Sequence, residues 1–309
     1  MQTPENLLVV INGAERSYAA LSRAVKFADI KPVTITLISA VYEPILELTS
    51  ILAPEERDQL KKHYLAERTN AIEKLKTKYE TDNIKINLHV VWYKKLQQLV
   101  VDYCNEHSVD LVIKRIGGDA GSSNPFVMPC DWYLLRFCKS PLLLINDEKW
   151  QENSPILAAV SAESSESDDQ EHRQLDDKIL DYSHMLASIF NGQAHVIHSH
   201  INPVLDINFD SPTTIVPDDF RHQVTQHFAD RMQKLMSKHA FNEQHIHIVE
   251  GVAEEKIPAT AESINAQLVV LGTVGRSGLT AAFMGNTAER VLAHLTCEVL
   301  ALKPDGFDI

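Results

Sequence analysis

Three glycines near the carboxyl terminus are spaced as in a loop that binds an anion. Gly272 ends an apolar run that starts at Leu268, Gly275 follows shortly after, and Gly285 precedes a helix-like segment that starts near Thr287. Glycine has no Cβ, so backbone N–H groups beside it can approach a phosphate closely. The first turn of a helix adds free N–H donors and the positive end of the helix dipole. This pattern predicts phosphate binding, with a nucleotide as the first candidate, and does not by itself predict catalysis.

The sequence lacks the motifs of common phosphate chemistry. It contains neither a Walker-type Gly-x4-Gly-Lys-Ser/Thr loop nor a Gly-x-Gly-x-x-Gly fingerprint. Without a P-loop lysine or an obvious magnesium carboxylate, ATP turnover has no clear machinery. The segment Gly275–Gly278 also fails the Gly-x-Ser-x-Gly spacing of a nucleophile elbow. We therefore assign no catalytic residue and expect a binding protein, with weak ATP hydrolysis as an alternative.

Histidines gather in the carboxyl-terminal half. His198 and His200 alternate onto one face of a predicted strand, and His245 and His247 do so on the next one. Two such strands are neighbours in a doubly wound sheet, so His198, His200 and His247 could converge and hold zinc. The alternative, which we favour, is that these histidines are scattered core and surface residues.

The elements that must position these residues occur twice along the chain. Short apolar runs at 7–11, 35–38, 88–91, 109–113 and 141–145 correspond to runs at 156–160, 195–198, 246–249, 266–270 and 298–302. Helix-like segments at 18–28 and 54–79 correspond to those at 175–189 and 218–239. Alternation of strand and helix implies a parallel sheet with helices on both faces. We predict an α/β fold of two tandem doubly wound domains, each with a five-stranded parallel sheet flanked by helices.

A polar segment that ends in Pro155 separates the two halves. We place the boundary at residue 152, which gives domains 1–152 and 153–309. The second half carries extra residues after its first strand, in the acidic run 163–171. This run is expected to be a solvated loop. A sharper hypothesis makes it an acidic flap over the ligand pocket, which would disfavour a triphosphate.

The glycine motif is present in the second domain alone. Aligned on the repeat, Gly272 and Gly285 correspond to Arg115 and Met128, and the next residue of the first domain is Pro129. A side chain at Met128 and the missing N–H of Pro129 both remove features of an anion loop. The first domain should therefore not bind phosphate in this manner.

Composition narrows the choice of partners and compartment. The chain has 29 Lys and Arg against 42 Asp and Glu, a net charge of −13, which repels nucleic acid and anionic lipid. No apolar run is long enough for a membrane span, and no signal peptide is recognisable. The four cysteines lack metal-ligand or disulfide spacing, and Cys104 and Cys297 are expected to be reduced core thiols. We expect a cytoplasmic protein that does not bind nucleic acid directly.

The spacing Gly-x2-Gly-x9-Gly after the fourth of five strands resembles the nucleotide-binding motif of the universal stress protein family. Two such domains in one chain resemble its tandem members. The segments 129–136, 272–278 and 284–289 also carry this resemblance. In that family the final strand of each domain sits at a sheet edge, and exposed edges seek partners. We therefore expect the strands 141–145 and 298–302 to pair across a pseudo-two-fold axis, and the whole chain could form a homodimer.

The resemblance also implies the residues of the ligand site. It implies phosphate contacts at Gly272, Gly275, Gly285, Asn286 and Thr287, with Arg276 in the same loop. The family usually has Ser or Thr where this chain has Asn286, whose amide can still donate a hydrogen bond. Val160 and Val252 would line an adenine slot by the same analogy. Ser161 stands where the family's nucleotide binders carry a ribose-binding Asp.

The resemblance implies a role in stress responses. Our hypothesis is a non-enzymatic stress-response protein whose second domain binds ATP, a related nucleotide or another phosphate-bearing ligand. A first alternative is a weak ATPase that uses the same glycine loop. A second alternative is a binder of a phosphorylated lipid or sugar-nucleotide intermediate, with its apolar part held in the first domain.

Overall fold

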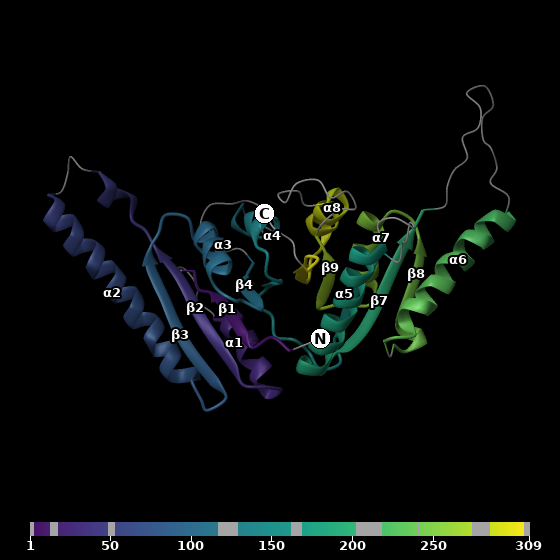
Figure 1. Ribbon diagram of the computed structural model, residues 1–309, viewed down its shortest axis with the longest axis horizontal. Coiled ribbons are helices and arrows are strands. Elements are labelled where there is room, and N and C mark those ends of the chain that lie inside the picture. Colours follow the sequence, from purple (N-terminus) through teal and green to yellow (C-terminus); the bar gives the residue numbers. More distant parts are fainter. Residues whose placement is uncertain are drawn as a thin grey trace, which may run out of the picture.

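Both halves of the chain contribute to one ten-stranded sheet (Figure 1). The computed structural model describes residues 3–12, 18–48, 53–116, 129–161, 169–201, 218–239, 241–273 and 285–305. The strand order is β3-β2-β1-β4-β5-β10-β9-β6-β7-β8, so the first five strands form one half of the sheet and the last five form the other. The predicted fold of two tandem α/β domains is confirmed.

The strands follow the apolar runs of the sequence. In the first half they are β1 (Asn6–Val10), β2 (Val33–Val41), β3 (Ile84–Trp92), β4 (Leu111–Arg115) and β5 (Leu142–Ile145). In the second half they are β6 (Pro155–Ala159), β7 (Gln193–His200), β8 (Ile246–Glu250), β9 (Leu268–Gly272) and β10 (Glu298–Leu302). Central strands are apolar at consecutive positions because both faces of a parallel sheet are covered. In β1, for example, Leu7 and Val9 pack into one core and Leu8 and Val10 into the other.

Helices cover both faces of the sheet. They are α1 (Ala19–Ala24), α2 (Pro54–Tyr79), α3 (Leu96–Glu106), α4 (Pro129–Phe137), α5 (Asp169–Phe190), α6 (Asp218–Met236), α7 (Ala253–Ser263) and α8 (Asn286–His294). Short 3₁₀ helices are η1 (Val25–Asp29), η2 (Pro44–Glu47) and η3 (Glu243–His245). Helices α1, α2, α5 and α6 pack into one core, and α3, α4, α7 and α8 pack into the other (Figure 1). Helices α3 and α7 were not among the elements predicted from the sequence.

The two halves join at an antiparallel seam between β5 and β10. Leu143 lies opposite Leu300 at its centre, while every other pairing in the sheet is parallel. The predicted pairing of the two final strands across a pseudo-two-fold axis is confirmed. Because the strands of the two halves run in opposite directions, their carboxyl ends lie at opposite edges of the ten-stranded sheet.

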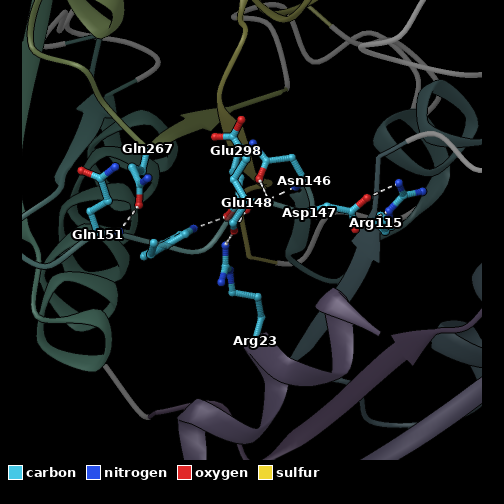
Figure 2. Close-up of polar contacts among 9 residues, drawn as sticks. Arg23, Arg115, Asn146, Asp147, Glu148, Gln151, Gln267 and Glu298 are labelled. Carbon is cyan, nitrogen blue, oxygen red and sulfur yellow. Dashed lines mark hydrogen bonds and ion pairs between the residues drawn. The ribbon is translucent and has the colours of Figure 1, made fainter. Parts of the chain in front are cut away.

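A buried charge cluster reinforces the seam. Figure 2 shows Arg23 directed at Glu298 and at the backbone of Glu148. Glu298 also accepts hydrogen bonds from the Trp150 indole at 2.6 Å and from the Asn146 amide at 3.2 Å. Burial raises the pKa of Glu298, and the guanidinium of Arg23 opposes that rise. The cluster therefore joins α1, the interdomain segment and β10.

Candidate functional site

The second domain has a topological switch point between β6 and β9. These strands lie side by side, with Ala159 paired to Leu271, although they are far apart in sequence. Val160 and Ser161 therefore leave the sheet beside Gly272, as expected from the sequence. Doubly wound folds bind ligands at this crevice, outside the carboxyl ends of the strands.

The amino terminus of α8 lies at the same edge. The Gly285 amide donates to the Thr273 carbonyl at 2.9 Å, which ties the start of α8 to the end of β9. The first amide bonded within the helix is that of Glu289, which donates to Gly285 at 3.0 Å. The amides of the three preceding helical residues, 286–288, thus point out of the helix end. No side chain in the described part of the chain caps this end, so these amides form a potential anion site.

This geometry gives different roles to the residues that the family resemblance implies for phosphate binding. Asn286 and Thr287 are exposed in the first turn of α8, where backbone and side chain can both donate. Gly285 is the N-cap residue, and its own amide is already bonded to Thr273. Gly285 therefore shapes the site without an amide to offer. Gly275 and Arg276 lie outside the described residues.

Gly272 has a packing function that the sequence did not reveal. A Cβ built at this position would lie 2.7 Å from Cδ2 of Leu175 on α5. This distance is shorter than a normal carbon contact, so with any larger residue at position 272 the end of the Leu175 side chain would have to move. Gly272 is also paired with Leu302 in the sheet. Its lack of a side chain is thus explained by close helix–sheet packing.

Asp176 is a buried carboxylate that sequence reasoning missed. The Ser161 amide donates to its Oδ1 at 3.1 Å, so a carboxylate from α5 lies at the end of β6. Ser161 stands where the family resemblance leads one to expect an Asp on the strand itself. A carboxylate is therefore present near this position but comes from a different element. The Ser161 amide is therefore occupied by Asp176.

Val252 lies at the same edge but farther along it. It is the N-cap residue of α7 and follows β8, which β7 separates from β6. An ion pair of 3.1 Å joins Arg290, in the middle of α8, to Glu254 in the first turn of α7. Val160 and Val252 thus both lie on the β6–β8 side of the crevice, and residues 162–168 of the acidic run lie outside the described part of the structure.

The structure does not bring the proposed zinc ligands together. His198 and His200 face α6, where their rings lie 4.7 and 4.9 Å from the ring of Phe228. His247 is on the opposite face of the sheet, with its Nε2 3.1 Å from Nδ1 of His195. The predicted convergence of His198, His200 and His247 is therefore wrong. Within the described ranges, no group of three or more His, Cys, Asp or Glu side chains is arranged to hold a metal.

The equivalent place in the first domain is filled by an internal ion pair. Lys114 on β4 and Asp131 in the first turn of α4 are fully buried and 2.6 Å apart. Aligned on the repeat, these positions are Leu271 and Ala288 in the second domain. The Asp131 carboxylate thus lies near the start of α4, as a bound anion would. The neighbouring Arg115 pairs with Asp147.

The carboxyl ends of the strands in the two domains are too far apart to bind one ligand together. They point in opposite directions because β5 and β10 are antiparallel. The alternative in which the second domain holds a phosphate while the first holds the apolar part of the same molecule is not supported by this geometry. No helix among the described residues is both long and apolar enough to cross a bilayer.

Comparison with known proteins agrees with this architecture. The model of the "Universal stress protein family" matches residues 4–146 and 154–303. The chain is 30% identical to the "Universal stress protein E homolog" of Haemophilus influenzae over 98% of this chain and 99% of that protein. It is 32% identical to "Universal stress protein E" of Escherichia coli K12 over 98% of this chain and 95% of that protein.

Solved structures show the same likeness. A putative universal stress protein from Pseudomonas aeruginosa UCBPP-PA14 has a TM-score of 0.74 and 26% identity, over 98% of this chain and 95% of that one. A universal stress protein from Archaeoglobus fulgidus shares the fold, with a TM-score of 0.63 at 14% identity, over 96% of this chain and 98% of that one. The chain therefore belongs to the universal stress protein family and carries two of its domains in tandem.

Proposed function

We propose that the second domain binds a nucleotide, or another phosphate-bearing ligand, at the start of α8. The observation that carries this proposal is the uncapped first turn of α8 beside the switch point of β6 and β9. Three amides and a helix dipole converge there, and no side chain of the described residues occupies them. The first domain instead has the Lys114–Asp131 pair at the equivalent place.

The proposed site has a polar part and an apolar part. The amides of residues 286–288, the Thr287 hydroxyl and the Asn286 side chain would donate to phosphate oxygens. Val160 and Val252 would contact a base, and Ser161 a sugar. Gly272 would lie at the base of the site, where the end of β9 packs against α5. Gly275 and Arg276 are included on the sequence motif alone.

We assign binding without a catalytic step. The chain has no P-loop lysine, and Asp176, the described carboxylate beside Ser161, is buried and already accepts a backbone hydrogen bond. Membership of the universal stress protein family supports a role of this binding in a stress response, which we propose takes place in the cytoplasm. A homodimer of the tandem chain is part of the same proposal, and light scattering over a range of concentrations tests it.

Calorimetry with ATP, ADP and AMP on the wild type, Gly285→Asp and Gly285→Ala tests the binding site. The backbone at Gly285 has φ −60° and ψ 136°, which any residue can adopt. An Asp at this N-cap would accept hydrogen bonds from the first-turn amides and repel phosphate. We expect affinity to fall about tenfold or more in Gly285→Asp and to change little in Gly285→Ala.

Equal affinity in all three proteins would place the ligand elsewhere. An ATP turnover assay on the same proteins distinguishes the weak-ATPase alternative from binding alone. Steady ATP turnover in the wild type that disappears in Gly285→Asp would add hydrolysis to the site, whereas binding without turnover supports the proposal as stated.

A further inference from the structure

Two buried cysteines meet between neighbouring helices of the first domain. Cys104 lies on α3 and Cys138 directly follows α4. Their sulfur atoms are 3.8 Å apart, although 34 positions separate them in the sequence. Both are free thiols, and their side chains are 1% and 2% exposed. Neither residue belongs to the proposed ligand site.

The surroundings of the two thiols are unequal. The hydrogen bond with Cys104 lowers the pKa of Cys138, and the nearby ammonium groups of Lys303 and Lys139 act in the same direction. The same hydrogen bond, together with burial, raises the pKa of Cys104. Cys138 is therefore the better nucleophile, and Cys104 keeps its proton to a higher pH.

Lys303 fixes a positive charge beside Cys138. It lies at the end of β10, in the second domain, and its Nζ donates to the carbonyls of Arg136 at 2.7 Å and Cys138 at 2.6 Å. Burial lowers the pKa of Lys303 to about 8, while the charge of Cys138 opposes that change. The cation that supports Cys138 is thus supplied across the seam.

A cavity of about 1040 Å³ leads to this pair. It lies between the amino ends of β1 and β4 and the helix α5 of the other domain. Cys104 lines it, and so do Lys139 and Ser140, which follow Cys138. A small oxidant in this cavity can therefore reach the Cys104 side of the pair, and the Cys138 sulfur lies 3.8 Å beyond the Cys104 sulfur.

We propose that Cys104 and Cys138 form an intramolecular disulfide when the protein meets a peroxide. A disulfide needs a sulfur–sulfur distance of about 2.05 Å, so the two sulfur atoms must approach by roughly 2 Å. Rotation about the side chains and a small shift between α3 and α4 supply a movement of this size. The site is then a two-electron redox pair and not a pair of inert core residues.

The reaction balances with hydrogen peroxide as the oxidant. The Cys138 thiolate attacks one peroxide oxygen, the O–O bond breaks, and the leaving hydroxide takes up a proton to become water. The Cys104 thiol loses its proton and attacks the sulfur of the resulting sulfenic acid, which releases a second water. Two thiols lose two electrons in total, and one peroxide is reduced to two waters. A dithiol reductant reduces the disulfide to the two thiols and is itself oxidised to a disulfide.

Peptide mapping of the full-length wild type tests this proposal. The protein is treated with hydrogen peroxide, remaining thiols are alkylated in denaturant, and trypsin digestion is followed by mass spectrometry without reduction. Cleavage at Lys95, Lys114, Arg136 and Lys139 separates Cys104 and Cys138 from each other and from the other cysteines. We expect the peptide joined through Cys104 and Cys138 to be the dominant cross-link and to disappear with dithiothreitol.

Cys297 is the internal control, because burial raises its pKa to about 12 and it should remain alkylated. A urea-unfolded sample should give mixed pairs, since the fold no longer selects partners. Cross-links that involve Cys130 or Cys297 as often as Cys104, or no Cys104–Cys138 cross-link at a peroxide dose that oxidises methionine, would overturn the proposal.

The order of attack has its own test. Dimedone should trap a sulfenic acid on Cys138 in Cys104→Ser, and should label Cys104 several-fold less in Cys138→Ser. Stronger labelling of Cys104 than of Cys138 would show that Cys138 is not the nucleophile. Peptide mapping would still decide whether the Cys104–Cys138 disulfide forms.

Discussion

Arg23 on the first helix donates a hydrogen bond to Glu298 on the last strand, at 2.9 Å, so the two ends of the fold are held by one buried ion pair. Removal of one partner of such a pair leaves the other charge buried without compensation. We expect Arg23→Ala to lower the free energy of unfolding by about 3–5 kcal/mol at pH 7. Urea denaturation measures this change.

The same variant has a predictable pH dependence. Arg23 opposes the rise in the pKa of Glu298, so its removal raises that pKa further. A carboxyl group with a raised folded-state pKa binds a proton more readily in the folded protein, so its stability penalty shrinks as the pH falls. The deficit of Arg23→Ala should therefore be smaller at pH 5 than at pH 7. Lys26→Ala, which removes an exposed ion pair with Asp29, is the control and should cost under about 0.5 kcal/mol at both pH values.

The buried pair of the first domain can be exchanged for the residues of the second. Lys114→Leu and Asp131→Ala should each destabilise by about 3–5 kcal/mol, because each removes the charged partner of a buried ion. The double variant reproduces the Leu271 and Ala288 of the repeat and should be more stable than either single variant. A double-mutant cycle by chemical denaturation measures the coupling. Strict additivity would contradict the assignment of this pair, and Arg136→Ala, on an exposed ion pair, should cost under about 1 kcal/mol.

Gly272 provides a test of the close packing between β9 and α5. Gly272→Ala should destabilise the protein by about 1 kcal/mol, because its Cβ would meet Cδ2 of Leu175 at 2.7 Å and this side chain must leave its preferred rotamer. In the double variant with Leu175→Ala, the clash is absent, so the two changes should cost less together than the sum of their separate costs. Thermal unfolding of the four proteins gives the coupling. A sum of the two single effects would show that the clash is not the cause of the instability.

His195 makes stability depend on pH. Burial lowers its pKa to about 4, and the neighbouring imidazoles of His245 and His247 add to this effect. The folded protein therefore resists protonation of His195, and this contribution to stability is lost as the pH falls from about 6.5 towards 4. In His195→Gln the loss of stability over this range should be about 1–3 kcal/mol smaller than in the wild type. His63→Gln, at an exposed position on α2, is the control for the loss of an imidazole outside the core.

Local sequence patterns predicted most of the regular elements. The predicted helix 54–79 is the observed α2, which has Pro54 at its start and acidic residues in its first turn. Helix α7 was not named, and Pro258 in its interior argues against a helix by sequence alone. The seam between β5 and β10 was predictable from the exposed edges of two similar domains.

The candidate site was predictable in position but not in detail. The repeat and the doubly wound topology place Val160 beside Gly272, as observed. The choice of Thr273 as the acceptor for Gly285, and the approach of Asp176 to Ser161, depend on side-chain and loop geometry that the sequence does not encode locally. The histidines show the same limit. His198 and His200 alternate along β7 as predicted, whereas His245 lies in η3, before β8 begins. The register between β7 and β8 then decides which histidines share a face.

The antiparallel seam between β5 and β10 lies within one polypeptide. Its formation is governed by an effective concentration set by the short connecting segment, and not by the amount of protein in solution. Dilution therefore does not separate the two domains, and their stoichiometry is fixed at one to one. Because each domain always pairs with the other domain of its own chain, pairs of identical domains do not compete. The two domains can therefore diverge in sequence, so that one has Lys114 and Asp131 where the other has Leu271 and Ala288.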